Sequence, residues 1–342
     1  MKHVHSELEF SRGTLHLRQV RAEGYGGKVD GGARVEIFAG NLTRRHQVPL
    51  VQAHFKANGL DLTALGAGPY AIGRLFAEGQ VSGPLDDLKG SATVRVPRAT
   101  IQGERYESTL LRVGLLRDRV SVYQGQMTRA GGGRLSMWGD LYFDQRLDLR
   151  LKIERFPVVG IPELSGAALG LGGRIDGQVK LTGTLDDLRL GGKVKLADAK
   201  VRGVSLGSGE LDLTPGQDSV QLKGRFFGKL LTLEGHLLLS PHPRLQLTLN
   251  VTRLPLERVF YEVRRIGDVR GLMDGRVRLA FDAKKGLTWA DARFPRVRLF
   301  LRYRPPGRRK VRVVNLANQQ DLLARYDGRQ LHVVKTRLLT TV

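Results

Sequence analysis

Apolar and polar residues alternate along most of the chain, and the segment 147–153 shows this pattern most clearly. It reads Leu-Asp-Leu-Arg-Leu-Lys-Ile, so every second residue is apolar. Successive side chains of a β-strand point to opposite faces, which predicts a strand with one apolar face and one charged face. The segment 245–251, Leu-Gln-Leu-Thr-Leu-Asn-Val, repeats the pattern 98 residues later. We expect the two strands to occupy equivalent places in a repeated structure.

A longer repeat supports this interpretation. Gly-Pro-Leu-Asp-Asp-Leu at 83–88 returns as Gly-Thr-Leu-Asp-Asp-Leu at 183–188, a spacing of 100 residues. A Gly-Arg pair precedes each copy, at 73–74 and 173–174, and an alternating segment follows each. Because Asp and Gly favour turns, we interpret each copy as a turn between strands. A matched turn at a fixed period indicates a repeat architecture.

The strand exits are also repeated. Arg-Phe-Pro at 155–157 and Arg-Leu-Pro at 253–255 follow the two alternating segments. Proline lacks the N–H that a strand ladder needs, so each exit should end its strand, and 256–263 could then form a short amphipathic helix.

These periods divide the chain into four units within one continuous repetitive domain. We place a partial β repeat at 1–70, full repeats at 71–165 and 166–265, and a truncated repeat at 266–342, which suggests a segment of a longer protein. Roughly eight strands fit each period at the usual strand spacing. The predicted fold is all-β, an elongated, repetitive, curled antiparallel sheet that is groove-like and has few short helices.

The excess of positive charge indicates either an anionic partner or a solvated face. The chain holds 56 Lys and Arg against 33 Asp and Glu, a net charge of +23. The simpler interpretation is that the cations cover the polar face of the sheet; the alternative is a surface for anionic headgroups or an acidic partner. The basic cluster at 305–310 is most simply a basic turn, and the alternative is a contact site. Only 6% of the residues are aromatic, which speaks against base stacking.

The motifs of the sequence do not indicate an enzyme. Gly-Val-Ser-Leu-Gly at 203–207 matches the nucleophile-elbow pattern, but that motif needs a helix after the serine, and a strand pattern follows here. The pairs Asp86-Asp87 and Asp186-Asp187 could bind calcium or exchange protons, yet their turn role is sufficient. The eight histidines lack metal-ligand spacing and cysteine is absent, so we expect no cofactor and no metal. No run approaches the ~18 apolar residues of a membrane span, and the N-terminus lacks the apolar core of a signal peptide.

Taken together, the glycine-led strands, the Gly-Thr-Leu-Asp-Asp-Leu turn and Val-Arg-Gly-Val at 201–204 resemble the TamB and AsmA-like envelope proteins, from about residue 24 to about residue 302. The resemblance implies a gutter-shaped β-sheet whose apolar face carries phospholipid acyl chains across the periplasm between the inner and outer membranes. It also implies an inner-membrane anchor, an outer-membrane barrel of the BamA class as partner, and a role in outer-membrane biogenesis or protein secretion. We expect no counterpart of the family's N-terminal anchor in this segment, and its terminal region does not clearly match the family's C-terminal domain.

Three functions remain open at this stage. The first is a non-enzymatic lipid conductor, the second a scaffold or chaperone for outer-membrane proteins, and the third a basic nucleic-acid-binding protein, which rests on charge alone, so we expect no nucleic acid as partner. The alternation fits an open groove and a dry sandwich core equally well. The residues predicted to line a lipid groove are Leu147, Leu149, Leu151, Ile153, Val179, Leu181, Val194, Leu196, Leu245, Leu247, Leu249 and Val251.

Overall fold

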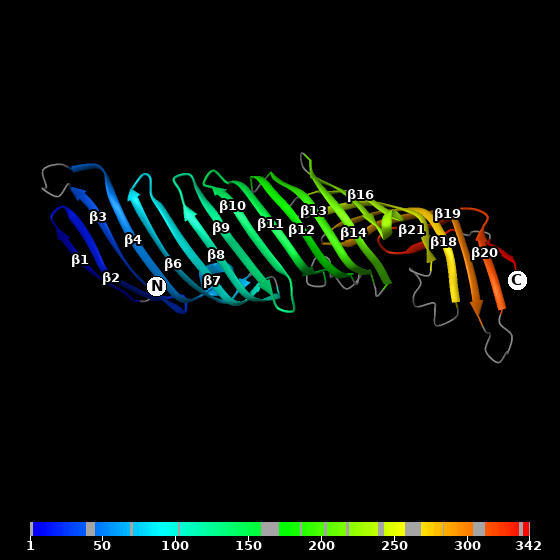
Figure 1. Cartoon of the computed structure of the whole chain (residues 1–342), viewed down its shortest axis with the longest axis horizontal. Helices are drawn as coiled ribbons and strands as arrows, with labels where there is room; N and C mark the ends of the chain where they lie inside the picture. Colours follow the sequence, from blue (N-terminus) through cyan, green and yellow to red (C-terminus); the bar gives the residue numbers. More distant parts are fainter. Residues whose placement is uncertain are drawn as a thin grey trace. The chain divides into compact units, whose positions relative to one another are not determined.

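The computed structural model is built almost entirely of antiparallel β-strands (Figure 1). It describes residues 3–38, 45–68, 71–101, 103–158, 171–184, 187–201, 204–216, 219–238, 243–256, 268–282, 284–303, 312–334 and 338–341. The helical elements with bounds in these ranges are two single turns, η1 (Thr63–Ala67) and η3 (Phe227–Lys229). The predicted all-β, repetitive antiparallel fold is therefore confirmed.

The chain divides into two compact units. The first holds residues 1–156 and 180–186, and the second holds 157–179 and 187–342, so that β12 (Leu171–Thr184) contributes to both. In the first unit each strand pairs with the next along the chain, except that β4 pairs with β6 and the two-residue β5 pairs with β7. Besides β12, the strands of the first unit are β1 (His3–Ser11), β2 (Thr14–Gly24), β3 (Gly27–Phe38), β4 (Arg45–Asp61), β5 (Ala71–Ile72), β6 (Arg74–Pro84), β7 (Lys89–Ile101), β8 (Glu104–Leu115), β9 (Arg119–Arg129), β10 (Arg134–Tyr142) and β11 (Arg146–Pro157).

The second unit follows the same plan up to its last long strand. Consecutive strands pair from β13 to β19, and the far edge of β19 is then shared by β20 and β21. The strands are β13 (Leu188–Val201), β14 (Val204–Pro215), β15 (Ser219–Phe226), β16 (Leu231–Leu238), β17 (Arg244–Pro255), β18 (Asp268–Asp282), β19 (Gly286–Tyr303), β20 (Arg312–Asn318), β21 (Leu322–Tyr326), β22 (Leu331–Val333) and β23 (Leu338–Thr341).

The sequence period of about 100 residues corresponds to six strands. The first residues of β7, β8 and β9 are Lys89, Glu104 and Arg119, and those of β13, β14 and β15 lie 99 or 100 positions later. The expectation of about eight strands per period was wrong, because these strands run for 8 to 14 residues and are joined by tight hairpins. Longer strands leave room for fewer of them.

The Leu-Asp-Asp-Leu motif is a hairpin turn, as predicted. Its first copy connects β6 to β7, with the Asp87 N–H donating to the Pro84 carbonyl at 2.9 Å. The second copy lies between β12 and β13, and its residues 185 and 186 fall outside the described residues. Asp87 forms an ion pair with Lys89 at 3.8 Å, and Asp187 forms the equivalent pair with Arg189 at 3.0 Å. The carboxylates therefore serve the turn.

The strand exits contain residues with a left-handed backbone, and at Asp198 and Arg253 the register of the ladder also shifts. Arg98 in β7, Arg155 in β11, Asp198 in β13 and Arg253 in β17 all have φ between 47° and 55°. Such a shift, a β-bulge, bends its strand, and each of the four left-handed residues is followed directly by a buried side chain. Those side chains are Ala99, Phe156, Ala199 and Leu254. We call this line of bends the crease of each unit. The helix expected at 256–263 lies outside the described residues, except for Leu256, which is buried at the crease.

Candidate functional site

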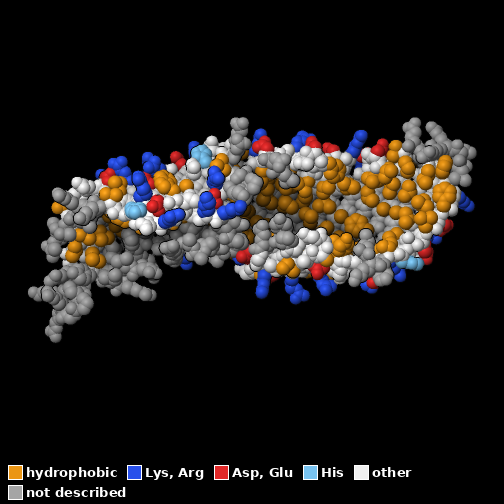
Figure 2. All heavy atoms as spheres, turned by 180° about the vertical axis from the view of Figure 1, so that it is seen from behind, with side chains coloured by type: hydrophobic (Ala, Val, Ile, Leu, Met, Phe, Trp, Pro, Cys, Tyr) orange, Lys and Arg blue, Asp and Glu red, His pale blue; other side chains and the backbone are white. Residues whose placement is uncertain are grey.

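One face of the first unit is apolar from strand to strand. Residues that pair directly across an antiparallel ladder point to the same face. Following these partners gives an uninterrupted row that contains no charged residue. The row is Val4, Ala22, Val29, Ala57, Ala77, Val94, Leu111, Gly125, Met137 and Leu151. Figure 2 shows this face as a hollow lined by hydrophobic side chains, with charged side chains along its borders.

The second unit repeats this arrangement. Its corresponding row is Val194, Leu211, Gly224, Leu233, Leu249, Val277, Ala292 and Ala324. Most of these side chains are half-buried, and full burial is concentrated at the crease, where Phe227, Val251 and Leu254 form a cluster. The two faces thus present apolar surface that the described residues cover only in part.

The structure places the predicted groove residues on these two faces. The four in β11 pair with apolar residues of β10, for example Leu147 with Leu141, and the four in β17 pair with β16. Val194 and Leu196 of β13 face Leu211 and Gly209. In β12, Val179 is buried, and Lys180 points to the polar face, where it forms an ion pair with Asp148 at 3.1 Å. By strand alternation Leu181 then shares the side of Val179. Their contact with lipid stays a prediction.

Residues of the apolar face such as Phe55 were missed from the sequence because glycine or alanine takes alternate positions in their strands. Phe55 pairs with Gly31 and Gly79, and a Cβ on Gly79 would lie 2.7 Å from the Phe55 ring. The aromatic side chain therefore occupies the space above a glycine. A hydrophobic alternation search passes over such strands, although a glycine opposite an aromatic residue is a usable signal.

Charged groups enter the apolar side at the crease of the first unit. Arg129 forms an ion pair with Glu104 at 2.5 Å and lies over the Phe156 ring, 5.7 Å from its centre. Tyr106, beside this pair, is buried; burial, reinforced by the negative charge of Glu104, raises the pKa of its hydroxyl. This cluster forms the border of the apolar face at the crease.

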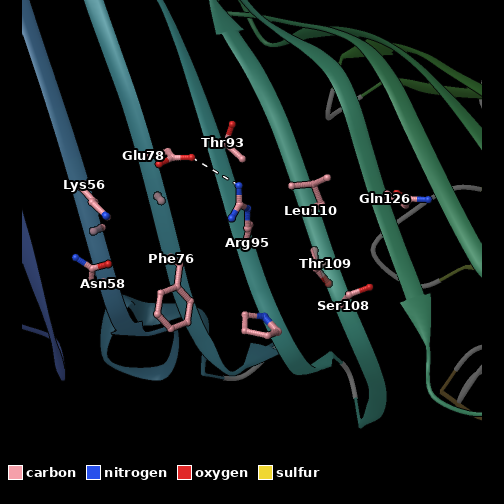
Figure 3. A pocket seen from close by; sticks show the side chains of 13 residues that line it. Lys56, Asn58, Phe76, Glu78, Thr93, Arg95, Ser108, Thr109, Leu110 and Gln126 are labelled. Atoms are coloured by element: carbon pink, nitrogen blue, oxygen red, sulfur yellow. Dashed lines mark ion pairs between the residues drawn. The ribbon is translucent and has the colours of Figure 1, made fainter.

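The opposite face is polar and is held by cross-strand ion pairs. Arg95 lies 3.6 Å from Glu78, and these two residues border a depression of about 680 Å³. The depression is lined by residues of β4, β6, β7, β8 and β9. Figure 3 shows it from close by, with Phe76 and Leu110 among polar neighbours. The face fits the interpretation of the excess cations as a solvated surface.

Catalytic geometry is not found at the positions singled out in the sequence. Ser205 lies within β14, paired with Lys200, so the strand, turn and helix of a nucleophile elbow are not formed there. In the described part of the chain no three His, Asp or Glu side chains are grouped to hold a metal ion. No helix within these ranges is long and apolar enough to cross a membrane. The basic cluster 305–310 lies outside the described residues.

Residues 124–253 match the family model of the TamB C-terminal domain. Over these residues the chain is TamB-like. The match begins in β9 and ends at the Arg253 bulge of β17, so the TamB segment contains all twelve predicted groove residues. The matched segment lies inside the chain, and the terminal region lies outside it. No curated protein and no solved structure matches the chain significantly. TamB proteins form a non-enzymatic transport and assembly family of the cell envelope.

Proposed function

We propose that this TamB-like chain conducts phospholipid along its apolar face in the periplasm, between the inner and outer membranes, and thereby supports outer-membrane biogenesis. The observation that carries the proposal is the pair of charge-free apolar rows, each crossing its unit from strand to strand. Acyl chains would lie against these rows, and the headgroups would stay in water beyond the charged borders.

The energetic requirement for such transport is a continuous apolar surface. Moving an acyl chain of ~16 methylenes into water costs about 13 kcal/mol, at ~0.8 kcal/mol for each methylene. A face lined by half-buried Leu, Val and Ala side chains removes most of this barrier. Successive strands offer similar side chains, as in Leu233 and Leu249, which pair directly. No position then binds the acyl chain much more tightly than the next, and the lipid can move.

A matched pair of variants tests the proposal. Leu247 lies on the apolar face, between Gly235 and Leu279, and its neighbour Gln246 lies on the polar face, between His236 and Ala280. Leu247→Asp would place a carboxylate against the acyl chain, which is costly in an apolar environment. Gln246→Asp adds the same charge on the other side of the strand.

Lipid bound to the purified chain is measured after extraction, and transfer is measured between donor and acceptor vesicles. We expect Leu247→Asp to lose bound lipid and transfer, and Gln246→Asp to keep both. Transfer that is equal in the two folded variants, or a wild-type chain that carries no phospholipid, would contradict the proposal.

A second candidate function is a scaffold for strands of outer-membrane proteins. In the described residues β1 pairs only with β2, and Phe10 and Leu8 are 55% and 66% exposed. Such an edge can accept an added strand from another chain. Photocrosslinkers placed in β1 and in β17 separate the two functions, because the scaffold predicts captured barrel protein at β1 and no lipid at β17. A BamA-class barrel partner is part of the same proposal.

A further inference from the structure

A basic depression lies on the polar face of the second unit, on the side opposite the apolar rows. It has a volume of about 580 Å³ and is formed by β17, β18 and β19. Three arginines and one aspartate line it, so its charged side chains sum to a net positive charge. The lining residues on which the inference rests are Asn250, Gly275, Arg276, Arg278, Asp291 and Arg293.

Two of these arginines are direct cross-strand partners. Arg276 of β18 pairs with Arg293 of β19, and both side chains point to the polar face. Directly opposed residues hold their Cβ atoms about 5 Å apart, and like charges in such positions destabilise a sheet. The arrangement therefore costs stability unless an anion lies between the two guanidinium groups.

The neighbouring carboxylates neutralise the other arginines more than Arg276. Asp291 accepts from Arg278 at 2.8 Å, and Asp321 forms an ion pair with Arg293. Arg276 instead donates its Nε–H to the neutral amide oxygen of Asn250 at 2.8 Å. This contact orients the guanidinium, and among the described residues no carboxylate forms an ion pair with Arg276.

Comparison of the repeats shows that this pair of cations is specific to one place. A Cβ on Gly79, Gly177 or Gly275 would lie 2.8, 2.6 or 2.7 Å from a carbonyl oxygen of the facing strand, so the three glycines are equivalent. Those carbonyls belong to Ser91, Lys193 and Arg293. The residue after the glycine is Gln80 in the first case, Gln178 in the second and Arg276 in the third. Only the third of these positions combines two arginines.

We propose that this depression binds a phosphate group, with Arg276 and Arg293 as its ligands and Arg278 beside them. Arginine suits this role because its planar guanidinium donates two parallel hydrogen bonds to phosphate oxygens. The phosphate can belong to a free phosphate or to the headgroup of an anionic lipid. The proposal concerns the polar face and does not depend on lipid binding in the groove.

The test uses the full chain and the fluorescence of Trp289, whose ring lies 5.7 Å from the Arg278 guanidinium. Trp138, the other tryptophan, is replaced by Phe in every variant. Inorganic phosphate is titrated at low ionic strength, and binding to phosphatidylglycerol vesicles is compared with binding to phosphatidylcholine vesicles. Arg276→Gln installs the residue of the two other repeats and should therefore fold. Arg225→Gln, on β15, removes the same charge from an exposed ion pair with Glu210.

We expect Arg276→Gln to weaken phosphate binding at least about tenfold, the loss of roughly one charged hydrogen-bonding group. Asn250→Asp should also weaken phosphate binding, because the new carboxylate would pair with the Arg276 guanidinium, which itself stays in place. Arg225→Gln should change the affinity less than about twofold, as a distant exposed charge does. Phosphate binding without vesicle binding would identify a small phosphate, and Arg276-dependent vesicle binding would identify a lipid headgroup. Equal weakening by Arg276→Gln and Arg225→Gln, or no binding of either probe by the wild type, would overturn the proposal.

Discussion

Arg155 and Arg253 hold the same backbone conformation at equivalent positions of consecutive repeats. Their φ angles are 47° and 48°, in the left-handed region that non-glycine residues seldom adopt. Each precedes a buried side chain and a proline that ends the strand. The strain is tolerated because the bend buries the following residue at the crease. At Arg253, where the register of the ladder shifts, the bulge bends β17.

Substitution at Arg253 should reveal this strain. Left-handed backbone costs about 1 kcal/mol or more for a residue with a Cβ, and more for a β-branched one. We expect Arg253→Val to lower the free energy of unfolding by about 2 kcal/mol, whereas Arg253→Gly should leave it within about 1 kcal/mol of the wild type. Urea denaturation of both variants gives the comparison. A valine variant as stable as the glycine variant would show that the bulge stores no such strain.

The sequence predicted the strand faces well where alternation is regular. In β11 and β17 each apolar residue faces an apolar partner, and the 100-residue turn marks the structural period. The number of strands was wrong, because strand length depends on hairpin geometry that the pattern does not contain. The left-handed residues were also missed, since Arg98 and Asp198 stand in ordinary strand sequence and the burial of Ala99 and Ala199 beside them is visible only in the structure.

The candidate sites differ in how far the sequence could reveal them. The apolar face follows from residue type alone, so the twelve residues predicted to line a lipid groove could be placed on it without coordinates, and their contact with lipid stays a prediction. The basic depression depends on which arginines are opposed across β18 and β19, and a bulge between Asp274 and Arg276 sets that register. Charge counting identifies an excess of cations but does not identify which two share a site.

The ion pair between Arg129 and Glu104 should stabilise the crease. Arg129 is 14% exposed and Glu104 is 24% exposed, so solvent screens the pair only partly. Arg129→Met would leave Glu104 without its partner, and we expect a loss of about 2 kcal/mol, less than for a fully buried pair. The double variant Arg129→Met, Glu104→Met should recover part of this loss. A double-mutant cycle in urea measures the coupling, and additive effects would contradict a direct interaction.

The hairpin between β10 and β11 should make stability depend on acid pH. Asp144 accepts from the Arg146 backbone N–H at 3.1 Å and from its Nε at 2.7 Å, and these bonds lower the pKa of the Asp144 carboxyl. A lowered folded-state pKa stabilises the fold above the ordinary Asp pKa of about 3.9, and the contribution is lost as the pH falls through the folded-state value. Asp144→Asn should flatten the acid limb of a plot of Tm against pH. Arg146→Ala keeps the backbone N–H and should retain most of the slope.

Asn318 should hold together the fork where β19 passes from β20 to β21. The Val297 N–H donates to Asn318 Oδ1 at 2.7 Å, and Asn318 Nδ2 donates to the carbonyls of Phe294 at 3.0 Å and Gln320 at 2.8 Å. The side chain thus replaces the backbone partners that β19 lacks at Pro295. Asn318→Leu would leave the half-buried Val297 N–H and Phe294 carbonyl without this partner, at about 1 to 3 kcal/mol for each group that water does not reach.

Hydrogen exchange of the Val297 amide reports on this fork directly. We expect Asn318→Leu to speed its exchange by at least about tenfold, since about 1.4 kcal/mol of local stability corresponds to that factor. Asn318→Asp is the matched control, because it keeps the acceptor for Val297 and loses the three bonds that Nδ2 donates. It should therefore protect Val297 better than the leucine variant while still weakening the link to Gln320. Equal exchange rates in the two variants would show that water, and not Asn318, satisfies the Val297 amide.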